Sequence, residues 1–273
     1  MNQLQKRDYF YLISSLPEMV LDQSRAPYSL VEFVEKLEEA LEPKDFEQVR
    51  LLLLPHDNRN LLRLLKNDTE EWEALGQYSE SEMKTLLQAE EGLPSYMHRF
   101  AQAYQEEQPL REGQSWRNQL TELYYDYALQ QSHGFLHDWL EFERDLRNVL
   151  AAWNIRRYEL EDEGQLVGKG EVVKALQKSR ARDFGLGSEF SYLNKLINDL
   201  ERDELSVREK AIDRVKWNYI DDQLVFYYFT IEVVLGYFLQ LRMLQRWLSL
   251  DAQAGQERVR AFISEMEQKI ELT

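Results

Sequence analysis

The sequence predicts an all-α protein made of two or three similar helical-bundle units. The chain has only 11 Gly and 6 Pro in 273 residues. It is rich in Leu, Glu, Gln, Lys, Arg and Ala, which favour helix. Few runs alternate apolar and polar residues with the β-branched enrichment that is typical of strands. A short phrase that occurs twice in helical sequence indicates an internal duplication.

The repeated phrase is D-x-R-N-[L/V]-L, found at Asp57–Leu62 and Asp145–Leu150. Asn is a poor residue inside a helix because its amide competes for backbone groups. An Arg-Asn pair that recurs in the same apolar frame therefore indicates a duplicated helix with a specific buried contact. The alternative is two unrelated amphipathic helices.

Each residue of the phrase has a predicted structural role. We expect Asp57 and Asp145 to cap their helices, Asn60 and Asn148 to bond a neighbouring backbone, and the arginines to reach an acid. The functional alternative is that Arg59 and Arg147 contact another protein of a complex.

In the first half of the chain, caps and prolines delimit the predicted helices. Residues 8–16 form a short helix or a strand. Ser29 and Glu32 match a capping box, as do Ser79 and Glu82, and Pro55 should end one helix before Asp57 starts the next. The expected helices span about 29–42, 45–54, 57–67, 79–91 and 94–104.

The stretch from Gln108 to Gly113 is the predicted boundary between an N-terminal unit, 1–110, and a C-terminal part, 111–273. Apolar residues spaced by four and three from Phe135 to Trp153 predict a long helix over about 133–158. An acidic, then Gly-rich stretch at 159–170 should be a flexible hinge. The further helices expected are about 115–131, 171–181, 190–200, 206–219, 222–249 and 255–270.

The run from Leu224 to Leu239 is almost wholly apolar and aromatic. It is shorter than the roughly twenty residues that span a bilayer, and Glu232 interrupts it. We therefore expect no transmembrane segment but a buried helix, 222–249, enclosed by other helices. Glu232 should be paired inside the fold; the alternative is a catalytic acid.

Composition excludes several classes of function. A net charge of −16 argues against nucleic acid, whose binding depends on Lys and Arg at phosphates. The absence of Cys excludes disulfides and thiolate chemistry and fits a reducing compartment. The N-terminal apolar run is too short and polar for a signal peptide, so we expect a cytoplasmic location.

No motif indicates a catalytic site, a metal site or a cofactor. His133, His137 and Glu141 have metal-ligand spacing on a helix, but they do not complete a known metal-binding pattern. The Gly-rich residues 164–170 are one residue short of a phosphate-binding loop and lack its hydroxyl residue. We therefore predict no catalytic residue, no metal and no cofactor.

The two phrases resemble those of the C-type subunit of V/A-type ATPases, whose counterpart in eukaryotic V-type pumps is the d-type subunit. More closely, the segments YFYLISSLP, HDNRNLL and FERDLRNVLAAWNIRRYE resemble an uncharacterised bacterial family encoded beside V-type ATPase subunits. Residues 230–235 are the candidate for a third phrase but lack the Arg-Asn pair. The resemblance implies an all-helical funnel that sits on the membrane rotor ring, receives the central stalk and performs no catalysis.

The resulting hypothesis is a non-enzymatic structural subunit for ion or proton transport, peripheral to the membrane through its protein partners. A helical scaffold with an unrelated partner is the first alternative. A metal or acid–base enzyme that uses His133, His137, Glu141 or Glu232 is the second.

Overall fold

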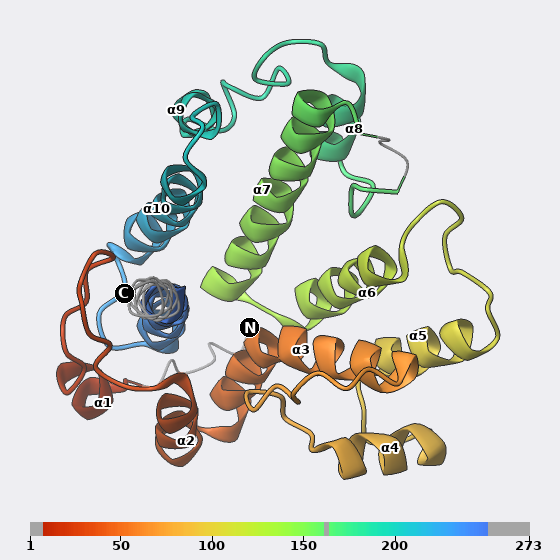
Figure 1. The fold of residues 1–273 in the computed structure, drawn as a ribbon. Coiled ribbons are helices and arrows are strands. Elements are labelled where there is room, and N and C mark those ends of the chain that lie inside the picture. Colours follow the sequence, from red (N-terminus) through yellow and green to blue (C-terminus); the bar gives the residue numbers. More distant parts are fainter. Residues whose placement is uncertain (1–7, 161–163, 251–273) are drawn as a thin grey trace, which may run out of the picture. The chain divides into compact units, whose positions relative to one another are not determined.

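A computed structural model describes residues 8–160 and 164–250, and all regular secondary structure in these ranges is helical (Figure 1). The predicted all-α class is thus confirmed. No helix in the described ranges is long and apolar enough to cross a membrane. The helix expected at 255–270 lies outside the described residues.

The chain forms two compact units, Met1–Ala40 with Val225–Thr273, and Leu41–Leu224. Both copies of the repeated phrase lie in the second unit. The boundary predicted near residue 110 falls inside that unit, in the loop between two of its helices.

The first unit contains α1 (Phe10–Ser14), α2 (Leu30–Ala40) and a helix from 231 to 250. The capping box that opens α2 is present, since Ser29 Oγ accepts from the Glu32 N–H while Glu32 accepts from the Ser29 N–H. Gln245, on the 231–250 helix, donates to the Tyr28 carbonyl and accepts from the Leu30 N–H. One amide thus fixes the start of α2 to the 231–250 helix.

The predicted helix 222–249 is wrong in its first third. The helix that precedes it, α10 (Leu205–Leu224), ends at Leu224, and residues 225–230 are not helical. Four aromatic residues in succession, 226–229, lose side-chain freedom in a helix. The Phe229 carbonyl instead accepts from the Tyr9 N–H at 2.6 Å. The rest of the run, from Ile231 to Leu244, is mostly buried as expected.

The second unit is built around two long helices, α3 (Pro43–Lys66) and α7 (Gly134–Tyr158). Both pack against α6 (Trp116–Gln131), which lies between them in the sequence and in Figure 1. After α3 the chain forms α4 (Glu80–Ala89) and α5 (Ser95–Gln105). After α7 it forms α8 (Glu171–Lys178), α9 (Leu193–Leu200) and α10.

Pro55 does not end a helix, contrary to the sequence prediction. It lies inside α3, where it cannot donate to the Leu51 carbonyl one turn earlier. The Tyr124 hydroxyl, from α6, donates to that carbonyl at 3.3 Å. The preceding carbonyl, of Arg50, accepts from Gln77 Nε2 at 3.2 Å. The Tyr124 hydroxyl thus replaces the N–H that the proline lacks, and α3 continues through the proline.

We expect Tyr124→Phe to lower the free energy of unfolding by about 1 kcal/mol, because the Leu51 carbonyl loses its donor. In a Pro55→Ala background the loss should be smaller, since the new backbone N–H can serve the same carbonyl. Urea denaturation of the four proteins in this double-mutant cycle measures the difference. Equal losses in both backgrounds would contradict this role of Tyr124.

Candidate functional site

Asn60 fixes the loop that follows α3. Its side chain is fully buried. Oδ1 accepts from the Glu73 N–H at 2.8 Å, and Nδ2 donates to the Glu73 carbonyl at 3.1 Å. Both polar backbone groups of one loop residue are therefore satisfied by one amide of the helix.

Asn148, at the matching place in the second phrase, does the same for the loop that follows α7. It is also fully buried. Oδ1 accepts from the Val167 N–H at 2.9 Å, and Nδ2 donates to the Val167 carbonyl at 2.8 Å. The expected bond from Asn to a neighbouring backbone is thus present in both copies, with the same pairing of atoms.

The surroundings of the two asparagines also share an order of elements. Each long helix ends at a non-glycine residue in the left-handed conformation, Asn67 with φ 53° and Glu159 with φ 51°. A loop anchored by the asparagine follows. The next helix, α4 or α8, then packs back on the long helix. The two phrases therefore mark equivalent helix–loop–helix segments.

We call the contacts of α3 with the loop after it the first anchor, and those of α7 with the loop after it the second anchor. In the first anchor, Arg59 binds the side chain of Glu73, the residue whose backbone Asn60 holds. Its Nε and a terminal nitrogen donate to the two carboxylate oxygens of Glu73, at 2.5 and 2.7 Å. His56 Nδ1 lies 2.6 Å from Glu73 Oε2. Burial raises the pKa of Glu73, but the bonds from Arg59 and His56 outweigh burial and lower the pKa to about 2.

Asp57 is completely buried and binds the loop further along. Its oxygens accept from the Gln77 N–H at 2.7 Å and from Gln77 Nε2 at 3.0 Å. Burial raises the pKa of this carboxyl to about 6, although the bonds from Gln77 act in the other direction. At Gly76 an added Cβ would lie 2.6 Å from Asn60 Nδ2, so only glycine leaves room for this contact.

Arg147 supports the second anchor indirectly. It donates to Asn118 Oδ1 at 2.7 Å, and Asn118 Nδ2 donates to the Gly164 carbonyl at 2.9 Å. Gln114 Nε2 lies 3.4 Å from the Leu166 carbonyl in the same loop. The prediction of a flexible hinge is therefore wrong for residues 164–167, which three side-chain amides hold; residues 161–163 lie outside the described ranges.

The predictions for the aspartates and for Arg147 need correction. Asp57 and Asp145 lie well inside α3 and α7 and cap neither helix, because both helices start more than ten residues earlier. Asp145 instead lies 3.2 Å from Arg144 Nε, and burial raises its pKa. Arg59 does reach an acid as expected, whereas Arg147 reaches an amide.

Glu232 belongs to the first unit and is buried, with 5% of its surface exposed. It lies in the first turn of the helix that starts at residue 231. A carboxylate is favoured there because the helix N-terminus carries partial positive charge. This position gives the buried acid a structural explanation.

The candidate metal ligands at the start of α7 do not form a cluster. His133 is the N-cap residue of α7, and His137 Nδ1 lies 3.7 Å from Asp138. Within residues 8–160 and 164–250, no group of three His, Asp or Glu side chains is placed to hold a metal ion.

Sequence reasoning missed an exposed aromatic cluster on the first unit. Tyr11, Phe226 and Tyr228 are 89%, 85% and 71% exposed. Phe10, half exposed, packs on Phe229 with ring centroids 4.7 Å apart, which joins the two segments. Large apolar side chains exposed on neighbouring segments are typical of surfaces that bind other molecules. The succession of aromatics at 226–229 is the signal in the sequence, but its apolarity points equally to burial.

We expect Asn60→Ala and Asn148→Ala each to lower the free energy of unfolding by about 2 to 4 kcal/mol, because one N–H and one carbonyl lose their partners. Asn154→Ala, on an exposed position of α7, is the matched control and should change stability little. Hydrogen exchange should locate the effect, with faster exchange of the Glu73 or Val167 amide. Unchanged exchange at these amides would contradict the anchoring role.

The two carboxyls of the first anchor should give opposite pH dependences. The raised pKa of Asp57 means that its contribution to stability is present below about pH 4 and is lost as the pH rises through about 6, an effect of about 2 to 3 kcal/mol. The lowered pKa of Glu73 makes its contribution present above about pH 4.5 and lost as the pH falls toward 2, with about 1 to 2 kcal/mol after solvent screening.

Denaturation from pH 3 to 8 of the wild type, Asp57→Asn and Glu73→Gln measures both effects. The wild type should lose stability relative to Asp57→Asn as the pH rises, and relative to Glu73→Gln as the pH falls. Differences that do not vary with pH would show that neither carboxyl titrates as described.

Comparison with known proteins identifies a family. A family described as "Protein of unknown function (DUF2764)" matches residues 6–270. No curated protein matches the chain. Because the match extends over nearly the whole sequence, the chain belongs to the DUF2764 family.

Proposed function

We propose that the protein is a non-catalytic structural subunit or adaptor of a V/A-type rotary ATPase, which couples the central stalk to the membrane rotor ring. The observation that supports the proposal best is the pair of identical asparagine anchors. They lie in the two phrases through which the sequence resembles the C-type subunit of these ATPases. Two phrases that had arisen by chance in Leu-rich helices would have no reason to bind backbone in the same way.

The anchors also suit the mechanical task. A coupling subunit has to transmit force without deforming. Loops are normally the most mobile parts of a helical protein. Here the loops after α3 and α7 are fixed to their helices by buried amides, and in the first copy also by the Arg59–Glu73 ion pair. Such a unit can act as a rigid body.

The aromatic cluster on the first unit supports binding of protein partners. Tyr and Phe are enriched at the centres of protein interfaces because they bury large areas at low entropic cost. We infer that Phe226 and Tyr228 contact another protein of the complex. On this proposal the partner contact lies outside the repeated phrase, whose Arg59 and Arg147 bind side chains within the chain.

Affinity purification of the tagged chain from cells that contain the ATPase tests the proposal. ATPase subunits should co-purify, and the double variant Phe226→Asp, Tyr228→Asp should reduce their recovery at least tenfold. Leu205→Asp, a similarly exposed apolar residue of the second unit, is the control and should retain them. A fully assembled and coupled ATPase in cells that lack the chain would refute the proposal.

A helical scaffold for an unrelated partner is the second candidate. One observation favours it, an open apolar groove in the second unit that neither anchor uses. This candidate predicts a stable complex without ATPase subunits in the same purification.

A further inference from the structure

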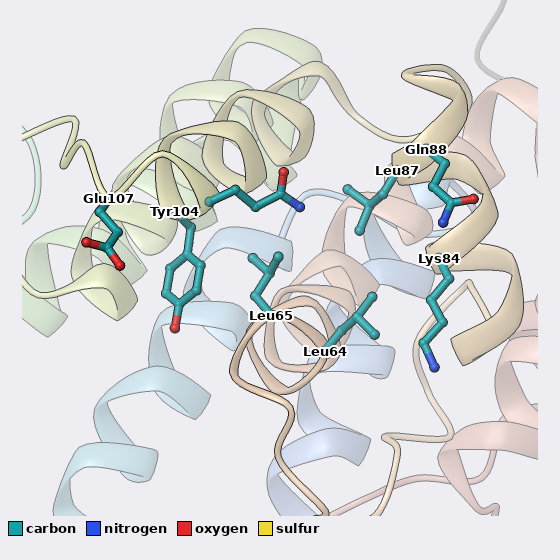
Figure 2. A pocket seen from close by; sticks show the side chains of 8 residues that line it. Leu64, Leu65, Lys84, Leu87, Gln88, Tyr104 and Glu107 are labelled. Atoms are coloured by element: carbon teal, nitrogen blue, oxygen red, sulfur yellow. The ribbon is translucent and has the colours of Figure 1, made fainter.

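The groove lies where the end of α3 meets α4 and α5 (Figure 2). Leu64 and Leu65 come from α3, Leu87 from α4 and Tyr104 from α5, and Figure 2 shows these side chains converging from three helices. The hollow has a volume of about 440 Å³. None of the four is fully buried, so they form an apolar floor open to solvent.

A second hollow adjoins the groove. It is lined by the 107–116 loop and by Gln119, it shares Tyr104 and Glu107 with the first, and its volume is about 760 Å³. Trp116 contacts Tyr104 with ring centroids 5.0 Å apart. The apolar surface therefore extends from Leu87 past Tyr104 to Trp116, across more than one helix.

The segments that frame the groove are strongly acidic. Residues 63–115, which run from the end of α3 to the start of α6, contain eleven Asp and Glu against five Lys and Arg, a net charge of −6. The two cations that line the hollows are already paired, Lys84 with Glu80 and Arg111 with the buried Glu122. The exposed carboxylates of this acidic frame are Asp68, Glu70, Glu71, Glu80, Glu82, Glu90, Glu91, Glu106, Glu107 and Glu112. Of these, Glu107 lines the groove itself, and Glu70 is paired with Arg63.

We propose that this groove binds a basic amphipathic helix of a protein partner. The apolar face of such a helix, with anchors at i, i+3 or i+4 and i+7, would rest on Leu64, Leu65, Leu87 and Tyr104. Its Lys and Arg side chains would then face the acidic frame. The charge selects against nucleic acids and acidic helices. The proposal holds for any partner and does not depend on association with an ATPase.

Binding of a fluorescently labelled 18-residue Leu/Lys peptide with helical spacing tests the proposal by anisotropy. Two controls are a peptide of the same composition with scrambled order and a helical Leu/Glu peptide. The Leu/Lys helix should bind at least tenfold more tightly than either, and added salt should weaken it. Equal binding of the scrambled peptide would show adhesion to an acidic surface and would overturn the proposal.

Variants locate the binding surface. Leu65→Gln with Leu87→Gln should weaken binding about tenfold, since two anchors of the groove are lost. Leu205→Gln, exposed elsewhere in the same unit, is the matched control and should leave the affinity unchanged.

Two charge variants at exposed positions do not put folding at risk. Glu107→Lys should weaken binding and Lys84→Glu should strengthen it, each about two- to fivefold. Affinities that none of these substitutions changes would overturn the assignment of the groove.

Discussion

A buried side-chain amide can satisfy one backbone N–H and one carbonyl at once, and the described structure depends on this interaction. Asn60 and Asn148 each bind both groups of a single loop residue. Gln48 bridges the Gln131 carbonyl and the His133 N–H at the junction of α6 and α7, and Gln119 bridges two residues of the loop before α6. An uncharged amide costs less free energy to bury than a charged group. These four amides bond N–H and carbonyl groups of loops and helix ends. Side-chain amides on the helices thereby hold these loops to the helices.

The first anchor also contacts the part of α3 that precedes Pro55. Asp57, Arg59 and Asn60 bind the loop at 73–77 from the part of α3 that follows the proline. The side chain of Gln77, in the same loop, donates through Nε2 to the Arg50 carbonyl before the proline. The loop thus contacts α3 on both sides of the proline, because the amide of Gln77 also contacts Asp57. The Tyr124 hydroxyl supplies the donor that the Leu51 carbonyl lacks in between.

Helix class, capping boxes and the long α7 could be predicted from the sequence because each depends on residues close together in the chain. The Ser29–Glu32 and Ser79–Glu82 caps are of this kind. The error at Pro55 had a different origin, since the donor that replaces the missing N–H comes from Tyr124, which is distant in the sequence. The loop at 164–167 has the composition of a flexible hinge, yet Asn118 and Asn148 fix it from other helices. The exposure of Phe226 could not be predicted either, because an apolar run does not show whether another element covers it. In each case the missing information was a contact distant in sequence.

The polar residues of the phrase differ in whether their binding partners are the same in the two copies. Asn binds backbone, whose chemistry is the same whatever side chain the loop residue has, and it pairs with Glu73 in one copy and Val167 in the other. The arginines bind side chains, and Asp57 binds both the N–H and the side chain of Gln77, so these contacts depend on what the loop or its neighbours supply. Arg59 binds the side chain of Glu73 directly. The matching residue of the second loop is Val167, which offers no acceptor side chain, and Arg147 contacts this loop through Asn118. Asp57 accepts hydrogen bonds from Gln77, whereas Asp145 is paired with the adjacent Arg144. The two bonds from Asn to one backbone residue thus persist while the contacts of Arg and Asp are replaced, and among the polar residues of the phrase the asparagine is the one with the same role in both helices.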